Sequence, residues 1–205
     1  MKILILSQNC ENYTGGYYQQ DWINAFSKKY DCDIYGPGYF KYSLSDDINM
    51  VAAKFNKIID EYDFIVTNPS WDRPGQKHND DNVNIHPKIN LSNINTVKKI
   101  YFLNKEYINL NAKLQYALIN KFDYIVSVFG EKKTREWEEK IGIPFIQLPF
   151  AVDINRVFSG NLPKRYDFSF TGSLHEKYSD LRWEVKKQLF KKNSNMILSM
   201  LKFLM

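Results

Sequence analysis

The sequence predicts an α/β fold built on a Rossmann-like, doubly wound parallel sheet. Short runs that are apolar throughout alternate along the chain with stretches whose apolar residues recur at helical spacing. Strands that lack polar alternation are buried on both faces, which requires helices on both sides of a parallel sheet. Ligands of such sheets bind beyond the carboxyl ends of the strands, so the loops after the apolar runs are the ones to inspect.

The first half of the chain predicts two strands and two helices. Residues 3–6 predict the first strand, and residues 18–29 follow with helical spacing and two lysines in the last turn, where the helix dipole favours cations. Residues 33–35 predict the second strand, closed by a Gly-Pro-Gly turn. An apolar stripe then recurs at helical spacing up to Tyr62, which predicts one continuous helix with Ser45 as its N-cap.

The second half continues the alternation after an irregular insertion. Residues 67–99 are polar and have no period, which indicates either a functional loop or a flexible insertion. A helix over 131–141 is expected to end at Gly142, a typical C-terminal glycine. Further strands are expected at residues 64–66, 100–103, 124–128 and 145–148, and a further helix at residues 110–118.

An aspartate between two aromatic residues precedes three of the apolar runs, at Asp63, Asp123 and Asp167. We interpret it as a stop for the preceding element rather than as a sequence repeat. The third copy follows a polar linker over residues 159–165, and it opens a further strand and helix. The sequence therefore predicts a first domain over residues 1–158, and a linker with the first βα unit of an incomplete second domain over residues 159–205.

Composition narrows the classes of function. The 205 residues carry a net charge of +5 that is spread along the chain, whereas nucleic-acid binders usually concentrate their basic residues. Cys10, Cys32 and the three histidines show no metal-ligand spacing, which argues against a structural zinc site. The sequence has no run long and apolar enough to span a bilayer and no secretory signal, so we expect a cytoplasmic protein without a membrane span.

Three strand-to-helix loops hold candidate binding residues. Gly15 and Gly16 offer backbone N–H groups to a phosphate or a sugar, although a plain tight turn also explains them. Cys10, in the same loop, has no identifiable histidine partner and is a poor candidate nucleophile. The second loop holds Asn104, Lys105 and Glu106, which a solvated salt bridge at a helix start also explains. The third loop holds Gly172, Ser173, His175 and Arg182, which a simple βα turn also explains.

Three motifs, in order, resemble those of GT-B glycosyltransferases of the group 1 type. They are FLNKEY at residues 102–107, LPFAVD at residues 148–153 followed by Phe158, and YDFSFTGSLH at residues 166–175. The subset that the chain most resembles is grouped with spore-coat maturation glycosyltransferases. The resemblance implies two Rossmann-like domains that face each other across a cleft, with the acceptor on the N-terminal domain and the nucleotide-sugar on the C-terminal domain.

The resemblance also implies roles for the candidate loops. Gly172 and Ser173 would approach the donor diphosphate, and Gly15 and Gly16 would face the same cleft. Such enzymes generally need no bound metal or other cofactor, so Lys105 and Arg182 are candidates for stabilising the leaving diphosphate. Glu106, Asp153 and the histidines are candidate acid or base groups, and the sequence assigns none of them.

The chain ends before the acidic nucleotide-sugar motif of that family. We therefore expect a truncated glycosyltransferase, a protein whose donor half comes from a second chain, or a protein that no longer catalyses transfer. The alternative function is a non-catalytic module that binds a glycan or a protein. A third hypothesis is an unrelated flavodoxin-like nucleotide binder, whose phosphate loop would have to be residues 7–16.

Overall fold

A computed structural model of the chain describes residues 1–11, 17–67, 89–103, 106 and 109–148. The chain divides into two compact units, Met1–Val157 and Phe158–Met205, and all of the described residues belong to the first unit. The predicted boundary at residue 158 and the predicted βα unit after it lie outside these residues and stay predictions.

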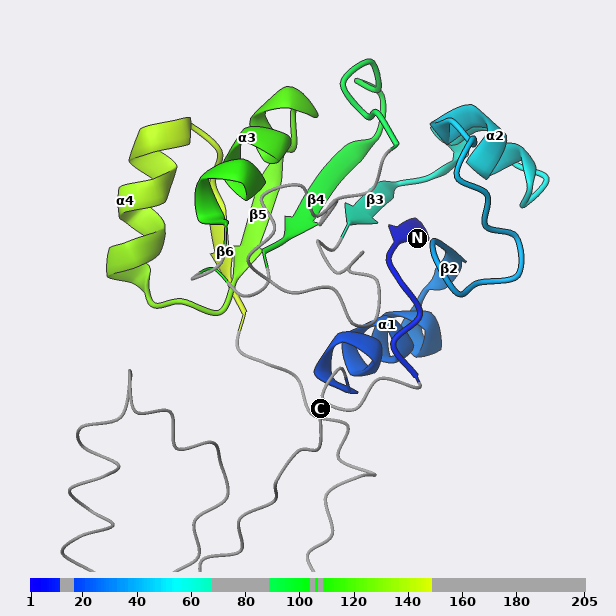
Figure 1. Ribbon diagram of the computed structural model, residues 1–205, viewed down its shortest axis with the longest axis horizontal. Helices are drawn as coiled ribbons and strands as arrows, with labels where there is room; N and C mark the ends of the chain where they lie inside the picture. Colours follow the sequence, from blue (N-terminus) through cyan, green and yellow to red (C-terminus); the bar gives the residue numbers. More distant parts are fainter. Residues whose placement is uncertain (12–16, 68–88, 104–105, 107–108, 149–205) are drawn as a thin grey trace, which may run out of the picture. The chain divides into compact units, whose positions relative to one another are not determined.

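Six strands form one sheet in the order β2-β1-β3-β4-β5-β6, and every neighbouring pair is parallel (Figure 1). The prediction of an α/β fold with a parallel sheet is confirmed, and the strand order is compatible with a Rossmann-like fold. The first five strands follow the order 2-1-3-4-5 that flavodoxin-like sheets share. The strands are β1 (Lys2–Leu6), β2 (Asp31–Tyr35), β3 (Phe64–Thr67), β4 (Lys98–Phe102), β5 (Tyr124–Ser127) and β6 (Phe145–Gln147).

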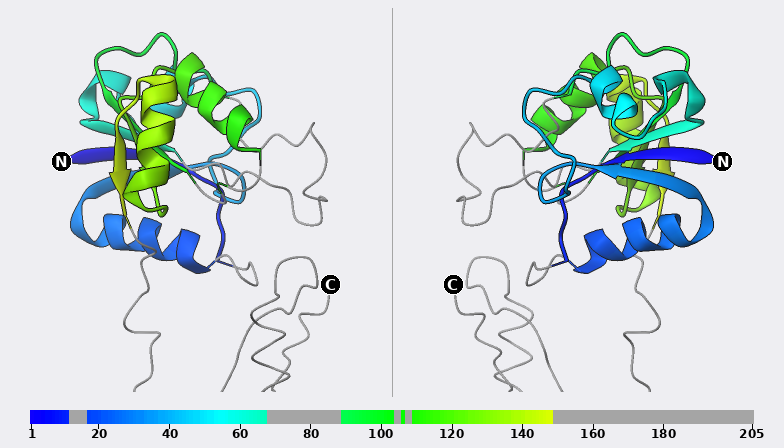
Figure 2. Two further views of the ribbon diagram at one scale, coloured as in Figure 1. Left: turned by 90° about the vertical axis from the view of Figure 1, so that its left-hand side faces the viewer. Right: turned by 90° about the vertical axis from the view of Figure 1, so that its right-hand side faces the viewer.

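Helices cover both faces of the sheet, as Figure 2 shows. On one face, Trp22 and Ile23 of α1 pack against side chains of β1 and β3. On the other face, α2 and α3 pack on the larger core, and Trp137 of α4 lies against it. The helices are α1 (Tyr17–Lys29), α2 (Ile48–Ala53), α3 (Leu110–Ile119) and α4 (Glu131–Ile141), with a short 3-10 helix, η1 (Ile59–Glu61).

Alternation along each strand divides the core into these two layers. In β3, Ile65 belongs to the layer under α2 and α3, whereas Val66 belongs to the layer under α1. Both side chains are fully buried, which explains why the strand shows no polar alternation in its sequence. The predicted end of α4 is also confirmed, because Gly142 adopts a left-handed conformation there and donates its N–H to the Glu138 carbonyl at 2.7 Å.

The prediction of one helix from Ser45 to Tyr62 is wrong. The N-cap of α2 is Asp47, whose Oδ1 accepts hydrogen bonds from the N–H groups of Asn49 and Met50 at 2.9 and 2.8 Å. The helix ends at Ala53, and η1 begins only at Ile59. The apolar stripe is real, since Ile59 and Tyr62 are buried, but a turn rather than a continuous helix brings them to the core.

Local contacts explain the early end of α2. Asn56 takes a left-handed conformation with φ of 57°, and the N–H of Lys57 returns to the Ala52 carbonyl at 3.2 Å. The Lys57 ammonium then reaches β2, where it lies 2.7 Å from Oδ2 of Asp33. The Tyr62 hydroxyl donates to the same oxygen at 2.6 Å, so side chains on both sides of the turn are tied to the edge strand.

Two of the predicted aspartate stops hold the beginnings of neighbouring strands together. Asp63 precedes β3, its carboxylate accepts the N–H of Lys2 at 2.7 Å, and its own N–H donates to the Lys2 carbonyl at 2.9 Å. Asp123 precedes β5 and makes the same pair of bonds with Lys99 of β4, at 2.8 and 2.9 Å. We call these two pairs the aspartate clamps. They lie at the amino ends of the strands, opposite to the edge where a doubly wound sheet binds ligands.

The clamp at Asp123 predicts an acid-sensitive contribution to stability. Burial alone would raise the pKa of Asp123, but hydrogen bonds from the Lys98 ammonium and the Lys99 N–H outweigh burial and hold that pKa below its usual value. The folded-state pKa is therefore lower than the unfolded-state pKa, which is about 4. The carboxylate thus adds stability above that value, and the contribution is lost as the pH falls through the folded-state pKa.

We predict that Asp123→Asn lowers the free energy of unfolding at pH 7 by about 1 kcal/mol, because the ion pair with the exposed Lys98 is modest and the amide still accepts the Lys99 N–H. Urea unfolding at pH 7, 5 and 3 measures this difference. The gap between wild type and variant should close below about pH 4. A gap of constant size across this range would contradict the prediction.

Candidate functional site

The candidate site is the edge of the sheet where the strands end. Three strands finish on a buried hydroxyl residue or are followed directly by one, and two further buried polar side chains lie in the loops beyond. Their fractional exposures are all below 9%. Because the strands are parallel, their carboxyl ends meet at one edge, where doubly wound sheets bind their ligands. These five residues, which we call the carboxyl-edge group, are Ser7, Gln8, Thr67, Glu106 and Ser127.

Glu106 joins the ends of two strands. It follows β4 in the chain, and its Oε1 accepts a hydrogen bond from the Ser127 hydroxyl at the end of β5 at 2.8 Å. The backbone N–H of Val128 donates to the same oxygen at 3.3 Å. The Ser127 hydroxyl in turn accepts the N–H of Phe129 at 3.1 Å, which fixes the direction of its own proton toward Glu106. The carboxylate is thus held in one orientation.

The predicted alternative for Glu106, a solvated salt bridge at a helix start, needs the neighbouring Lys105, which lies outside the described residues, so it stays a prediction. The residue is only 4% exposed, and α3 begins four positions later, at Leu110. No lysine or arginine in the described ranges forms an ion pair with it. A buried carboxylate without a counter-charge is costly unless hydrogen bonds hold it, and the Ser127 and Val128 donors supply two of them.

The loops after β1 and β2 run side by side at this edge. The N–H of Ser7 donates to the Tyr35 carbonyl at 3.0 Å, and the N–H of Asn9 donates to the Pro37 carbonyl at 2.9 Å. Gly36 makes this approach possible, because it has φ of 155° and a Cβ placed on it would lie 2.1 Å from the Ser7 carbonyl oxygen. The close pairing of the two loops holds Ser7 in its buried position.

The Tyr35 hydroxyl anchors the loop after β2. It accepts the N–H of Ser43 at 3.0 Å and contacts the Asp46 carboxylate, which also binds the Lys54 ammonium. Burial, and after it the hydrogen bond to Asp46, raises the pKa of Tyr35, so the phenol stays protonated at neutral pH. The Tyr35 hydroxyl therefore ties the loop after β2 to the end of that strand through Ser43 and Asp46.

Cys10 is a structural residue of the first loop. Its backbone N–H donates to Oε1 of the buried Gln20 at 3.0 Å, and its own side chain is buried. Burial raises the pKa of the thiol to about 11, so almost none of it is thiolate at neutral pH. This agrees with the sequence argument against Cys10 as a nucleophile.

Thr67 leaves a polar atom without a partner at the end of β3. Its side chain has no exposed surface, and its Oγ1 makes no hydrogen bond to any of the described residues. The residue pairs with Leu6 on one side and Tyr101 on the other, both fully buried. A buried hydroxyl without a partner costs stability, so it is a candidate contact for a bound molecule.

Of the predicted site residues, the structure describes only Glu106. Glu106 lies at the predicted edge. The others, Gly15, Gly16, Asn104, Lys105, Gly172, Ser173, His175 and Arg182, lie outside the described residues. The sequence argument missed Thr67 and Ser127 as candidates. A signal for them was present, since each closes an apolar run with a hydroxyl residue, and such a run ends at the ligand-binding edge of a parallel sheet.

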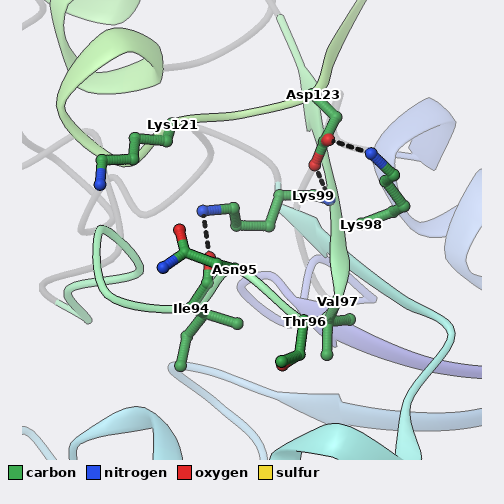
Figure 3. Close-up of a pocket in the computed structure, with 8 residues that line it drawn as sticks. All are labelled: Ile94, Asn95, Thr96, Val97, Lys98, Lys99, Lys121 and Asp123. Carbon is green, nitrogen blue, oxygen red and sulfur yellow. Dashed lines mark hydrogen bonds and ion pairs between the residues drawn. The ribbon is translucent and has the colours of Figure 1, made fainter.

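A pocket of about 130 Å³ lies at the opposite edge, beside the beginning of β4 (Figure 3). Three lysines line it, which suggests an anion site, but two of them are occupied. The Lys98 ammonium is bound by Asp123 at 2.6 Å. Lys99 is 2% exposed, and its three N–H donors go to the carbonyls of Leu91, Ile94 and Asn120 at 3.1, 2.7 and 2.7 Å.

An ammonium has three hydrogen atoms to donate, so Lys99 has none left for a ligand. Burial lowers its pKa, in line with a lysine that is enclosed by protein. We therefore assign the pocket a structural role. The buried lysine ties the segment before β4 to the end of α3.

In the described ranges, no three histidine, cysteine, aspartate or glutamate side chains gather as metal ligands. Among the helices of the same ranges, none combines the length and the apolar character that crossing a bilayer requires. Comparison of the chain with models of protein families, with curated proteins and with solved structures gave no match.

We predict that Gly36→Ala lowers the free energy of unfolding by about 2 kcal/mol or more, because its Cβ would collide with the Ser7 backbone. Gly130→Ala is the matched control. A Cβ at Gly130 meets nothing within 4 Å, so only a capping effect of under about 1 kcal/mol is expected. Chemical denaturation of both variants checks this, and equal costs would contradict the close approach of the two loops.

We also predict that Lys99→Met lowers the free energy of unfolding by about 2–4 kcal/mol, because three buried carbonyls lose their donor. Lys98→Met removes the neighbouring lysine, whose side chain is 62% exposed, and should cost less than about 1 kcal/mol. Denaturant unfolding of the two variants side by side is the measurement. A similar loss in both would show that Lys99 is not the structural cation.

Proposed function

We propose that the chain belongs to a glycosyltransferase that moves a sugar from a nucleotide-sugar to an acceptor hydroxyl, and that the described sheet is the acceptor-side domain. One observation carries the proposal: buried polar side chains gather at the carboxyl edge of a wholly parallel sheet, with Glu106 of the FLNKEY motif among them. The geometry supports the place of the site, and the resemblance of the three motifs supports the kind of reaction.

The chemistry of the proposed transfer suits such an edge. The acceptor oxygen forms a bond to the anomeric carbon of the sugar, and the bond from that carbon to the diphosphate oxygen breaks. The acceptor loses its proton, and the nucleoside diphosphate leaves with the negative charge. A protein assists by orienting the hydroxyl and by stabilising the diphosphate with fixed donors and cations.

Under this proposal, Glu106 belongs to the acceptor side. Lys105 and Arg182 stabilise the diphosphate, and Gly172 and Ser173 approach it with backbone N–H groups, as the resemblance implies. GT-B enzymes work in this way without a bound metal.

The strand order favours a second candidate, a nucleotide-binding module without transfer activity. In a sheet of order 2-1-3, the chain leaves β1 toward one side and later returns to pair on the other side. The switch point of the topology therefore lies between β1 and β3. Ser7 and Thr67 lie at these two ends. Phosphorylated ligands of flavodoxin-like proteins bind at this switch point.

An activity assay separates the two candidates. The purified chain is incubated with UDP-glucose and with GDP-mannose, and release of the nucleoside diphosphate is followed with and without simple sugar acceptors. Nucleotide binding is measured in parallel by calorimetry. Release that depends on an acceptor supports the transferase, whereas binding without release supports the module. Absence of both binding and release would remove both candidates.

If the chain transfers sugar, Lys105→Ala should lower kcat by about 10²-fold or more while the melting temperature stays nearly unchanged. Lys98→Ala is the matched control, because Lys98 lies at the amino edge and its ammonium binds Asp123. Its kcat should equal that of the wild type. Equal losses in the two variants would show that net charge, rather than a cation at the carboxyl edge, explains the effect.

A further inference from the structure

The Glu106 carboxylate is held through one oxygen only. Both of its described hydrogen bonds, from the Ser127 hydroxyl at 2.8 Å and from the Val128 N–H at 3.3 Å, reach Oε1. An ionised carboxylate oxygen accepts about two hydrogen bonds, so Oε1 is saturated. No residue of the described ranges donates to Oε2. The structure thus presents an oriented acceptor, on a residue that is only 4% exposed, with two lone pairs that the described protein does not use.

The surroundings of Glu106 indicate which chemistry would complete it. Burying a charge is costly unless donors solvate it, which favours a ligand that brings hydrogen-bond donors. The other members of the carboxyl-edge group carry no charge. The Ser7 hydroxyl already donates to the Gln8 carbonyl at 3.3 Å, whereas the Thr67 hydroxyl has no partner among the described residues and can donate or accept. A neutral molecule with several neighbouring hydroxyls matches this set. Acidic residues near the same edge of dinucleotide-binding sheets hold the hydroxyls of a ribose.

We propose that Oε2 of Glu106 accepts hydrogen bonds from the hydroxyls of a sugar, and that Glu106 determines specificity for a sugar at this edge. The choice of a sugar as the ligand rests on the proposed function. A site that is built to bind a hydroxyl discriminates strongly against molecules without one, because its buried acceptor would stay unpaired. Glu106 therefore selects the bound sugar through Oε2, while Oε1 keeps the ends of β4 and β5 together.

The two oxygens can be tested separately by substitution. Glu106→Gln keeps an amide oxygen that accepts from Ser127 and Val128, and it replaces Oε2 by an NH₂ group that donates. Ser127→Ala removes a donor to Oε1 and leaves Oε2 in place. The first variant addresses sugar binding, and the second addresses the connection between the strands.

The experiment uses the full chain and three named probes, the methyl α-glycosides of glucose, galactose and mannose. Saturation-transfer NMR measures their binding, and thermal unfolding reports the fold. We expect wild type to bind at least one glycoside, and Glu106→Gln to bind it at least tenfold more weakly, since hydrogen bonds to a charged group are strong. The melting temperature of Glu106→Gln should stay within about 2 °C of wild type, whereas that of Ser127→Ala should fall by about 2–4 °C.

Three results would overturn the inference: no binding of any glycoside to wild type, equal binding to Glu106→Gln, or failure of Glu106→Gln to fold, which would make the charge itself structural. The outcome is separable from that of the transfer assay. Glycoside binding that depends on Glu106, in a chain that releases no nucleoside diphosphate, keeps this inference and removes the proposed transfer. Diphosphate release that is the same in wild type and in Glu106→Gln supports the proposed transfer and removes this inference.

Discussion

The central position of β1, paired in parallel with both β2 and β3, is the constraint on which the structure depends. Parallel crossovers are right-handed, so the connections that leave β1 in one direction and pass back over it in the other must lie on opposite faces. This places α1 on one face and α2 on the other, and it buries both sides of the central strands. It also brings the strand ends, with their hydroxyl residues, to one edge.

Much of this fold follows from short-range patterns. Strands such as β1 were predictable because their runs are apolar throughout, whereas β2 contains two aspartates and was found from its last residues, Ile34 and Tyr35. The end of α4 was predictable because Gly142 relieves the strain of a left-handed residue. The predicted helix from Ser45 to Tyr62 failed because periodicity reports which side chains are buried, not whether the backbone between them stays helical. The ion pair of Lys57 with Asp33 spans 24 residues, and no local pattern contains it.

The candidate site was harder to predict from the sequence because its contacts join residues that lie far apart in the chain. Glu106 was identified from its place after an apolar run, but its partner Ser127 lies 21 residues away, and only the parallel pairing of β4 with β5 brings the two together. Thr67 becomes a candidate for ligand contact only when the strand order places it beside Leu6, at the end of β1. In the lysine-lined pocket, counting charges suggests an anion site, whereas Asp123 and the carbonyls around Lys99 already bind two of the three ammonium groups.

The aspartate clamps separate the alignment of the strands from the composition of the edge where ligands bind. Asp63 and Asp123 secure the beginnings of β1, β3, β4 and β5 through bonds to the backbone of Lys2 and Lys99, so this support does not depend on the loops at the far edge. Substitutions at the carboxyl edge therefore leave these clamps in place, although Gly36 and Glu106 make structural contacts of their own there. Changes of ligand specificity at the carboxyl edge can therefore be separated from the contacts that align the beginnings of these strands.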